Sequence, residues 1–315
     1  MSAENDEETQ GSGFFLHHYE PSPYAEKIRA MFGLAGAPWN SVLSPPYPPR
    51  PNVDPLAGGY RRIPIGQIGA DIFCDTALIA TEVAELCGHP EFAPVIHDSH
   101  ARALVERAEG DVFFAAITSA SPLKLLTKLV LANGLRGTLD FVRDRTAMMK
   151  KASLRPPQGK EARDLFQAFL ADLDSHLLAR EGLEGEALTY ADFSVYHPVW
   201  LGVSVSGPSI LKPYSEVLQW MERMQGLGHG KRREARPEEA FSAAERHEPR
   251  PLPAELLEHD ALHKRVTIAP ADYGKDGVEG ELVAVLADRV VLRREADRFG
   301  SLHVHFPRLG YDIVM

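Results

Sequence analysis

The chain has 315 residues, more than one typical domain, so we expect two or three domains. Its net charge of −10 argues against nucleic acid as the main partner, because binding phosphates requires a cationic surface. With only Cys74 and Cys87 present, we expect no disulfide framework and a reducing, cytoplasmic compartment. No apolar run reaches the roughly 18 residues of a membrane helix, so we expect no membrane partner.

The first part of the chain alternates short strand-like and helix-like segments. Residues 1–12 are acidic and polar, and we expect a disordered tail rather than a signal peptide. Ser22-Pro23 then precedes apolar positions at helical spacing, which is a strong signal for the start of a helix. The predicted order is a strand at 14–19, a helix from 23 to about 32, a strand at 39–43, a loop rich in Pro and Gly at 44–59, a hairpin of 61–68 and 72–74, and a helix from 75 to about 86.

Beyond this small α/β unit the pattern changes twice. Long amphipathic stretches predict an all-helical region that ends near residue 246. After a Pro-rich segment we expect a short helix at 254–263 and strands at 266–268, 282–286, 290–292 and 302–306. The predicted domains are therefore 13–90, 91–246 and a small β-rich module, 247–315, packed against the rest.

The Ser22-Pro23 step offers chemistry as well as structure. A helix start presents free backbone N–H groups and the positive end of the helix dipole, which stabilise a nearby thiolate. A Ser hydroxyl at that position can donate a further hydrogen bond to the anion. The alternative is that Ser22 only caps the helix, which is a common role for Ser.

Two further segments could bind a peptide-like ligand. A proline inside the strand-like run Arg62-Ile63-Pro64-Ile65 lacks an N–H, so it fits an edge position or a cis bond. If the bond is cis, the backbone of Ile63 can turn outward and pair with an extended peptide. Asp75-Thr76 opens the next helix, where N–H groups and a hydroxyl could hold a carboxylate and Asp75 could face an ammonium group. A functionless helix cap is the alternative for this pair.

The order and spacing of these segments raise their combined significance. From Phe14 to Cys87 the chain resembles the N-terminal, thioredoxin-like domain of glutathione transferases, and the resemblance extends through the helical region to about Arg246. It implies a cis Ile63-Pro64 bond, with Ile63 binding the cysteinyl backbone of glutathione and Asp75 and Thr76 holding its γ-glutamyl end. Ser22 would stand at the catalytic position, as in serine-type members.

The resemblance leaves part of the site open. The loop at 44–62 is long, so the basic residue for the glycine carboxylate of glutathione is not fixed; Arg50 and Arg62 are candidates. Thr189 and Asp192 resemble the buried capping box of this family's helical domain, and we expect a structural role for both.

The histidines raise the question of a metal. His303 and His305 share one face of a predicted strand, which suits two metal ligands. However, no cysteine or third histidine lies at zinc-finger spacing. The sequence therefore favours surface or hydrogen-bonded histidines and no metal site.

These observations support an enzyme that binds glutathione as co-substrate and activates its thiolate to attack a small electrophile, as in detoxification. The helical domain would supply an apolar pocket for that second substrate. The resemblance also implies a homodimer. The rival hypothesis is a non-catalytic binding or scaffold protein on the same fold, because fold does not fix function and the β-rich module could cover the cleft. A thiol oxidoreductase is disfavoured because no cysteine precedes Pro23.

Overall fold

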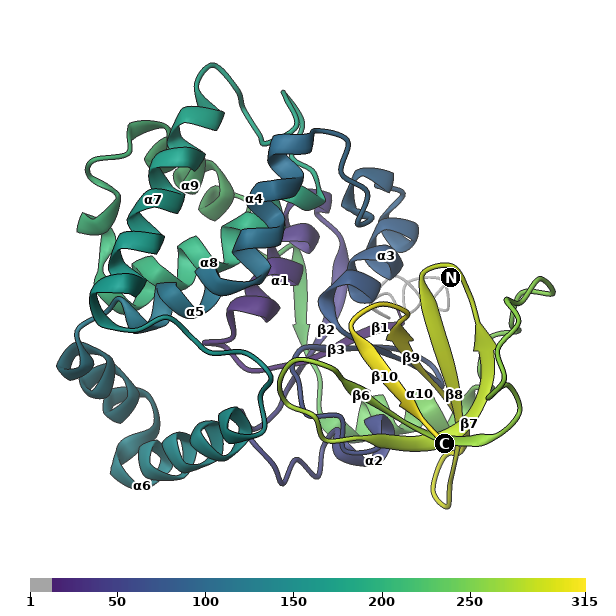
Figure 1. Cartoon of the computed structure of the whole chain (residues 1–315). Helices are drawn as coiled ribbons and strands as arrows, with labels where there is room; N and C mark the ends of the chain where they lie inside the picture. Colours follow the sequence, from purple (N-terminus) through teal and green to yellow (C-terminus); the bar gives the residue numbers. More distant parts are fainter. Residues whose placement is uncertain (1–12) are drawn as a thin grey trace, which may run out of the picture.

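The computed structural model describes residues 13–315, so the tail expected at 1–12 lies outside the described residues. The N-terminal unit has the predicted order of strands and helices (Figure 1). Its elements are β1 (Phe14–His18), α1 (Pro23–Ala35), β2 (Pro38–Leu43), α2 (Asp54–Ala57), β3 (Ile65–Ile68), β4 (Asp71–Cys74) and α3 (Thr76–Cys87). The short helix α2 lies within the segment that we expected to be loop throughout.

The pleat of these strands sends side chains to two separate cores. Phe14 and Leu16 of β1 and Phe73 of β4 point to the face covered by α1, α3 and the helical domain. Ile72 and Cys74, the neighbours of Phe73, point to the opposite face, which is covered by α2, α10 and the C-terminal strands. This period of two follows from strand geometry and fixes the register of the sheet.

The helical domain packs on the α1 and α3 side of the sheet (Figure 1). It comprises η1 (Pro90–Phe92), α4 (Ser99–Glu109), α5 (Asp111–Thr118), α6 (Pro122–Lys150), α7 (Gly159–Leu177), α8 (Tyr190–Ser206), η2 (Pro208–Leu211) and α9 (Ser215–Gly226). Gly134, with φ of 68°, kinks α6. The predicted capping box is present at the start of α8, where Thr189 and Asp192 satisfy each other's backbone N–H groups.

The chain after α9 returns to the sheet on both edges. First come β5 (Lys231–Glu234) and α10 (Pro237–Arg246), followed by β6 (Arg265–Pro270), β7 (Val278–Val285), β8 (Arg289–Ala296), β9 (Gly300–Pro307) and β10 (Tyr311–Val314). Strand β9 pairs in parallel with β4, and β5 pairs in parallel with β2. One ten-stranded sheet results, in the order β10-β6-β7-β8-β9-β4-β3-β1-β2-β5. The C-terminal module is thus hydrogen-bonded to the N-terminal domain as well as packed against it.

Three local predictions need correction. Strand β5 lies in the range that we expected to be all-helical. Its sequence, Lys-Arg-Arg-Glu, has no apolar periodicity that would indicate a strand, and it becomes one by pairing with the edge of β2. Residues 254–263 form no helix. Instead Leu252 and Leu256 pack against β7 and β8, and the N–H of Leu257 donates to Val285 O, so the sheet holds this segment as irregular chain. Strand β10 was not predicted.

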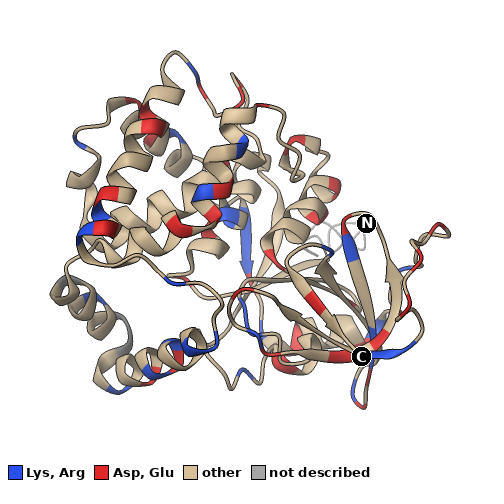
Figure 2. Ribbon diagram, viewed as in Figure 1, with Lys and Arg blue, Asp and Glu red and all other residues tan. Residues whose placement is uncertain are grey.

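No helix among residues 13–315 is long and apolar enough to cross a membrane. Basic and acidic residues are interspersed along the ribbon of the same region (Figure 2).

Candidate functional site

The sheet brings the predicted site segments to one of its ends. His17 of β1 lies beside Ile65 of β3, and Ile65 lies beside Cys74 of β4. The chain that leaves β1 toward Ser22, the chain that enters β3 through Pro64, and the chain that leaves β4 at Asp75 therefore meet at this end. Three segments that are distant in sequence become neighbours in the fold.

Ser22 caps α1. Its Oγ accepts a hydrogen bond from the backbone N–H of Ala25 at 3.2 Å, and its own N–H donates to the carbonyl of Tyr19 at 3.1 Å. The side chain is buried, and Pro23 follows at the first helical position. Ser22 therefore acts as a helix cap. Because Oγ accepts the Ala25 hydrogen bond through a lone pair, the hydroxyl proton remains able to donate to another group.

The Ile63–Pro64 bond is cis, as predicted, and both residues are buried. Asp75 caps α3 by accepting the N–H of Ala77 at 3.0 Å on Oδ1. Asp75 has a φ of 81°, a conformation that residues with a side chain seldom adopt. Thr76 follows it as the first residue of the helix and is buried.

Arg62 occupies the same end of the sheet. One of its guanidinium nitrogens lies 3.9 Å from Asp75 Oδ2. The nearby tyrosines and Asp272 more than offset the effect of burial and raise the pKa of Arg62 above its ordinary value. Arg50 is the other candidate for the glycine carboxylate. It is fully buried, and it pairs with Asp54 and with backbone carbonyls of the same loop.

The C-terminal module contributes residues that sequence reasoning missed. The guanidinium of Arg62 lies 4.2 Å over the ring of Tyr273, donates to the Tyr273 carbonyl at 2.7 Å and forms an ion pair with Asp272. The Tyr273 hydroxyl donates to that of Tyr24 on α1 at 3.4 Å. The loop between β6 and β7 therefore touches two elements of the candidate site.

The last strand of the module also contacts the site. Tyr311 OH donates to Asp75 Oδ2 at 3.3 Å and lies 2.5 Å from Tyr60 OH. Burial raises the pKa of Tyr24 and Tyr311 well above the ordinary tyrosine value, so both phenols stay protonated near neutral pH. Nothing in the sequence around Tyr273 and Tyr311 indicates a role in the site. They reach Arg62 and Asp75 because β9 pairs with β4 and so places the C-terminal module beside the site.

The helical domain borders the site through aromatic side chains. Tyr24 packs against Phe113 of α5 and His197 of α8, with ring centroids 4.7 Å apart in each pair. His197 is fully buried, and neither of its ring nitrogens has a hydrogen-bond partner within the described part of the chain. Burial lowers the pKa of His197 to about 3, so the ring is neutral.

Comparison with known proteins agrees with this architecture. A family profile described as "Glutathione S-transferase, N-terminal domain" matches residues 16–91. The crystal structure of a GST-like protein from Pseudomonas syringae is 31% identical, with a TM-score of 0.73 over 96% of this chain and 100% of that one. A glutathione S-transferase from Methylobacterium radiotolerans, in complex with glutathione sulfonate, is 18% identical over 67% of this chain and 90% of that one, with a TM-score of 0.46. A comparison with curated proteins gives no match.

Proposed function

Because this chain belongs to the glutathione S-transferase family, we propose that it binds glutathione at the end of the sheet where Ser22, Pro64 and Asp75 meet. The observation that carries the proposal is the convergence there of two capped helix N-termini, those of α1 and α3, with the Pro64 segment between them in the sheet. Two such termini suit a tripeptide that carries a thiolate and carboxylates, because N–H groups and helix dipoles favour anions.

Each end of glutathione has a proposed partner. The backbone of Ile63 would pair with the cysteinyl unit as an added strand. Asp75 would take the γ-glutamyl ammonium, and Thr76 would hydrogen-bond the neighbouring carboxylate. The unusual φ of Asp75 supports a role for its carboxylate, since glycine would otherwise suit that conformation. Arg62 lies next to Asp75, so its cation suits the γ-glutamyl carboxylate better than the glycine end.

The chemical step is proposed to begin at Ser22. Its hydroxyl would donate to the glutathione sulfur and stabilise the thiolate, together with the N-terminus of α1. The thiolate would then attack a small electrophile: the new bond forms between sulfur and the electrophilic carbon, and the leaving group departs with the electron pair of its own bond. Tyr24 and Phe113 are the side chains proposed to face that second substrate, with the buried ring of His197 packed behind Tyr24.

The C-terminal module is proposed to cover this cleft. Tyr311 hydrogen-bonds Asp75, and the loop with Asp272 and Tyr273 holds Arg62. Glutathione would share these partners with the module or displace it from them.

The same contacts favour a second candidate function, a non-catalytic binding protein whose site is closed by its own chain. An assay with glutathione and a generic aryl halide separates the two. Thioether formation above the uncatalysed rate, lost in Ser22→Ala, supports the enzyme. Glutathione binding with no turnover would support the non-catalytic binding protein instead.

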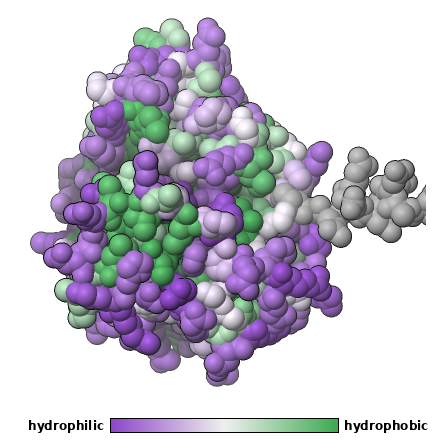
Figure 3. Space-filling model, turned by 90° about the vertical axis from the view of Figure 1, so that its right-hand side faces the viewer, coloured by the Kyte–Doolittle hydropathy of each residue, from purple (hydrophilic) through white to green (hydrophobic). Residues whose placement is uncertain are grey.

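Assembly and location complete the proposal. We expect a homodimer in the cytoplasm, with a detoxifying role. The structure offers apolar surface for contacts between copies: Leu131, Leu135 and Leu139 of α6 are 81%, 74% and 58% exposed. On another face, Figure 3 shows a hydrophobic patch surrounded by hydrophilic residues. Light scattering at micromolar concentration should give twice the chain mass, and a monomer mass would overturn the dimer.

A further inference from the structure

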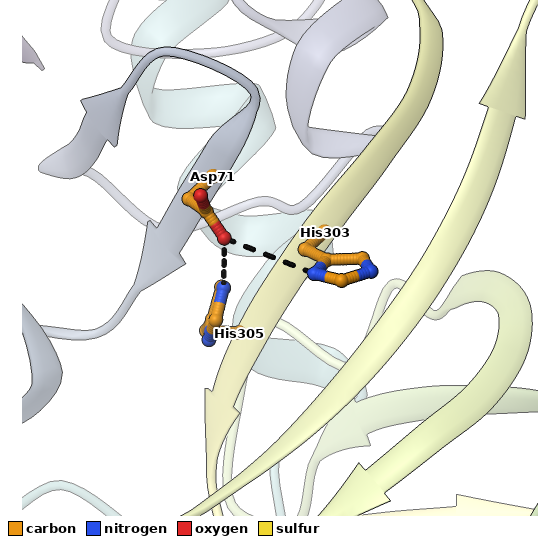
Figure 4. Close-up of side chains that lie close together, drawn as sticks. All are labelled: Asp71, His303 and His305. Atoms are coloured by element: carbon orange, nitrogen blue, oxygen red, sulfur yellow. Dashed lines mark hydrogen bonds and ion pairs between the residues drawn. The ribbon is translucent and has the colours of Figure 1, made fainter. Parts of the chain in front are cut away.

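Two histidines and an aspartate converge at the junction between β4 and β9 (Figure 4). The parallel ladder sets Asp71 beside His303 and Phe73 beside His305. Because residues i and i+2 of a strand share a face, both imidazoles lie on the side of the carboxylate. Asp71 Oδ1 is 2.8 Å from His305 Nε2 and 3.9 Å from His303 Nδ1, and all three residues are buried.

The hydrogen bonds present account for only part of this cluster. The hydrogen bond between Asp71 and His305 leaves His303 Nδ1 too far away to join it, and this buried nitrogen has no partner among residues 13–315. The three ligand atoms lie within 4.8 Å of one another. Ligands of a tetrahedral zinc ion with bonds of about 2.0–2.1 Å stand roughly 3.3 Å apart, so side-chain shifts on the order of 1 Å would complete the site.

The surroundings hold the carboxylate in place. The backbone N–H of Arg250 donates to Asp71 Oδ2 at 2.9 Å, and the guanidinium Nε of Arg250 lies 3.4 Å from the same oxygen, which leaves Oδ1 facing the histidines. Such second-shell hydrogen bonds orient ligands in metal sites. The side chains of Arg250 and Arg289 both pair with Glu82, at 2.8 and 2.6 Å, so a carboxylate partly offsets their charge near the cluster. Their presence makes us expect moderate affinity.

The donor set selects the kind of ion. Two imidazoles and one carboxylate suit a divalent first-row transition metal such as Zn²⁺, whereas Mg²⁺ and Ca²⁺ prefer oxygen ligands.

We propose that Asp71, His303 and His305 form a binding site for a divalent transition metal, with Zn²⁺ as the representative ion. The ion would join β4 of the N-terminal domain to β9 of the C-terminal module. His303 is the most exposed of the three, with 9% of its surface accessible, and a water molecule would complete a tetrahedral shell. This site is independent of glutathione binding.

Calorimetric titration of ZnCl2 into full-length protein, freed of metal by a chelator, tests the proposal. The expected result is one equivalent bound per chain with affinity on the order of micromolar, and a higher unfolding temperature with zinc. Asp71→Asn and His303→Gln should weaken binding at least about 100-fold. Co²⁺ in place of Zn²⁺ should give visible absorption that both variants lose.

The matched control is His100→Gln. His100 lies 3.2 Å from a second histidine, His176, and 3.1 Å from Asp172, but at a more exposed position. This variant should bind zinc like the unsubstituted chain. Loss of binding in His100→Gln and its retention in His303→Gln would overturn the proposal, as would the absence of zinc binding to the unsubstituted protein. His303 Nδ1 has no hydrogen-bond partner in the part of the chain that the structure describes, so His303→Gln should fold, and circular dichroism without metal verifies this.

Discussion

Replacing Ser22 tests whether its hydroxyl acts on the thiol of glutathione or only caps α1. The two roles predict different magnitudes. A hydrogen bond to a charged group contributes about 1.5–3 kcal/mol, and one pKa unit corresponds to about 1.4 kcal/mol. Loss of the hydroxyl should therefore raise the pKa of bound glutathione by roughly one to two units. Loss of the cap, the 3.2 Å bond from the Ala25 N–H, should cost about 1 kcal/mol of stability.

Two substitutions separate these effects. Ser22→Ala removes both the hydroxyl and the cap, whereas Ser22→Gly removes the hydroxyl but costs only a few tenths of a kcal/mol as a cap. Both variants should raise the thiol pKa equally, and only Ser22→Ala should unfold measurably earlier in urea. Glutathione affinity should change little, because Ile63, Asp75 and Thr76 are proposed to hold the rest of the tripeptide.

The assay is the thiolate absorbance of bound glutathione, followed against pH in all three proteins. If the titration curves coincide, Ser22 has no part in the chemistry and acts as a cap alone. Tyr24 would then be the next hydroxyl to test, since it lies on the same helix and contacts Tyr273.

Three further predictions concern stability. Lys27→Met should lower the free energy of unfolding in urea by about 2–3 kcal/mol. This loss is below the range for fully buried pairs because the side chain of Glu109, which lies 2.7 Å from the Lys27 ammonium, is 38% exposed. A double variant that also carries Glu109→Gln should recover part of the loss. Burial lowers the pKa of His17 to about 4 and of His197 to about 3, below the unfolded value of 6.5. As the pH falls from about 6.5 to about 4.5, only the unfolded chain gains these protons. Each histidine should therefore lower the free energy of unfolding by about 1.4 kcal/mol for each pH unit of the fall, and His197→Phe should flatten the dependence of stability on pH. Gly230→Ala should destabilise the chain, since φ is +65° there and a Cβ would meet backbone carbonyls.

The N-terminal fold was predictable because its signals are local. The aromatic run that begins at Phe14 and the Ser22-Pro23 start each depend on a few adjacent residues, and the structure agrees with them. Strand β5 was not predictable in this way. Its four polar residues acquire strand structure only from the edge of β2, which the chain reaches after the whole helical domain.

The same contrast holds for the candidate site. The resemblance to glutathione transferases predicted that Ser22, Pro64 and Asp75 belong to one site, and the pairing of β1, β3 and β4 brings their segments to the same end of the sheet. Tyr273 and Tyr311 carry no local signal of a role at Asp75 and Arg62. They reach these residues because β9 continues the sheet at β4, a pairing between residues more than 200 positions apart.

The most direct test of the account is calorimetric titration of the full-length protein with glutathione. The titration compares the unsubstituted chain with Asp75→Asn and with a control variant, Asp164→Asn, whose residue lies on the exposed face of α7. We predict saturable binding of one glutathione per chain, weakened about 10- to 100-fold in Asp75→Asn, since a charged hydrogen bond contributes about 1.5–3 kcal/mol. The control should bind like the unsubstituted chain. No binding by the unsubstituted protein, or equal binding by all three, would contradict the proposed site.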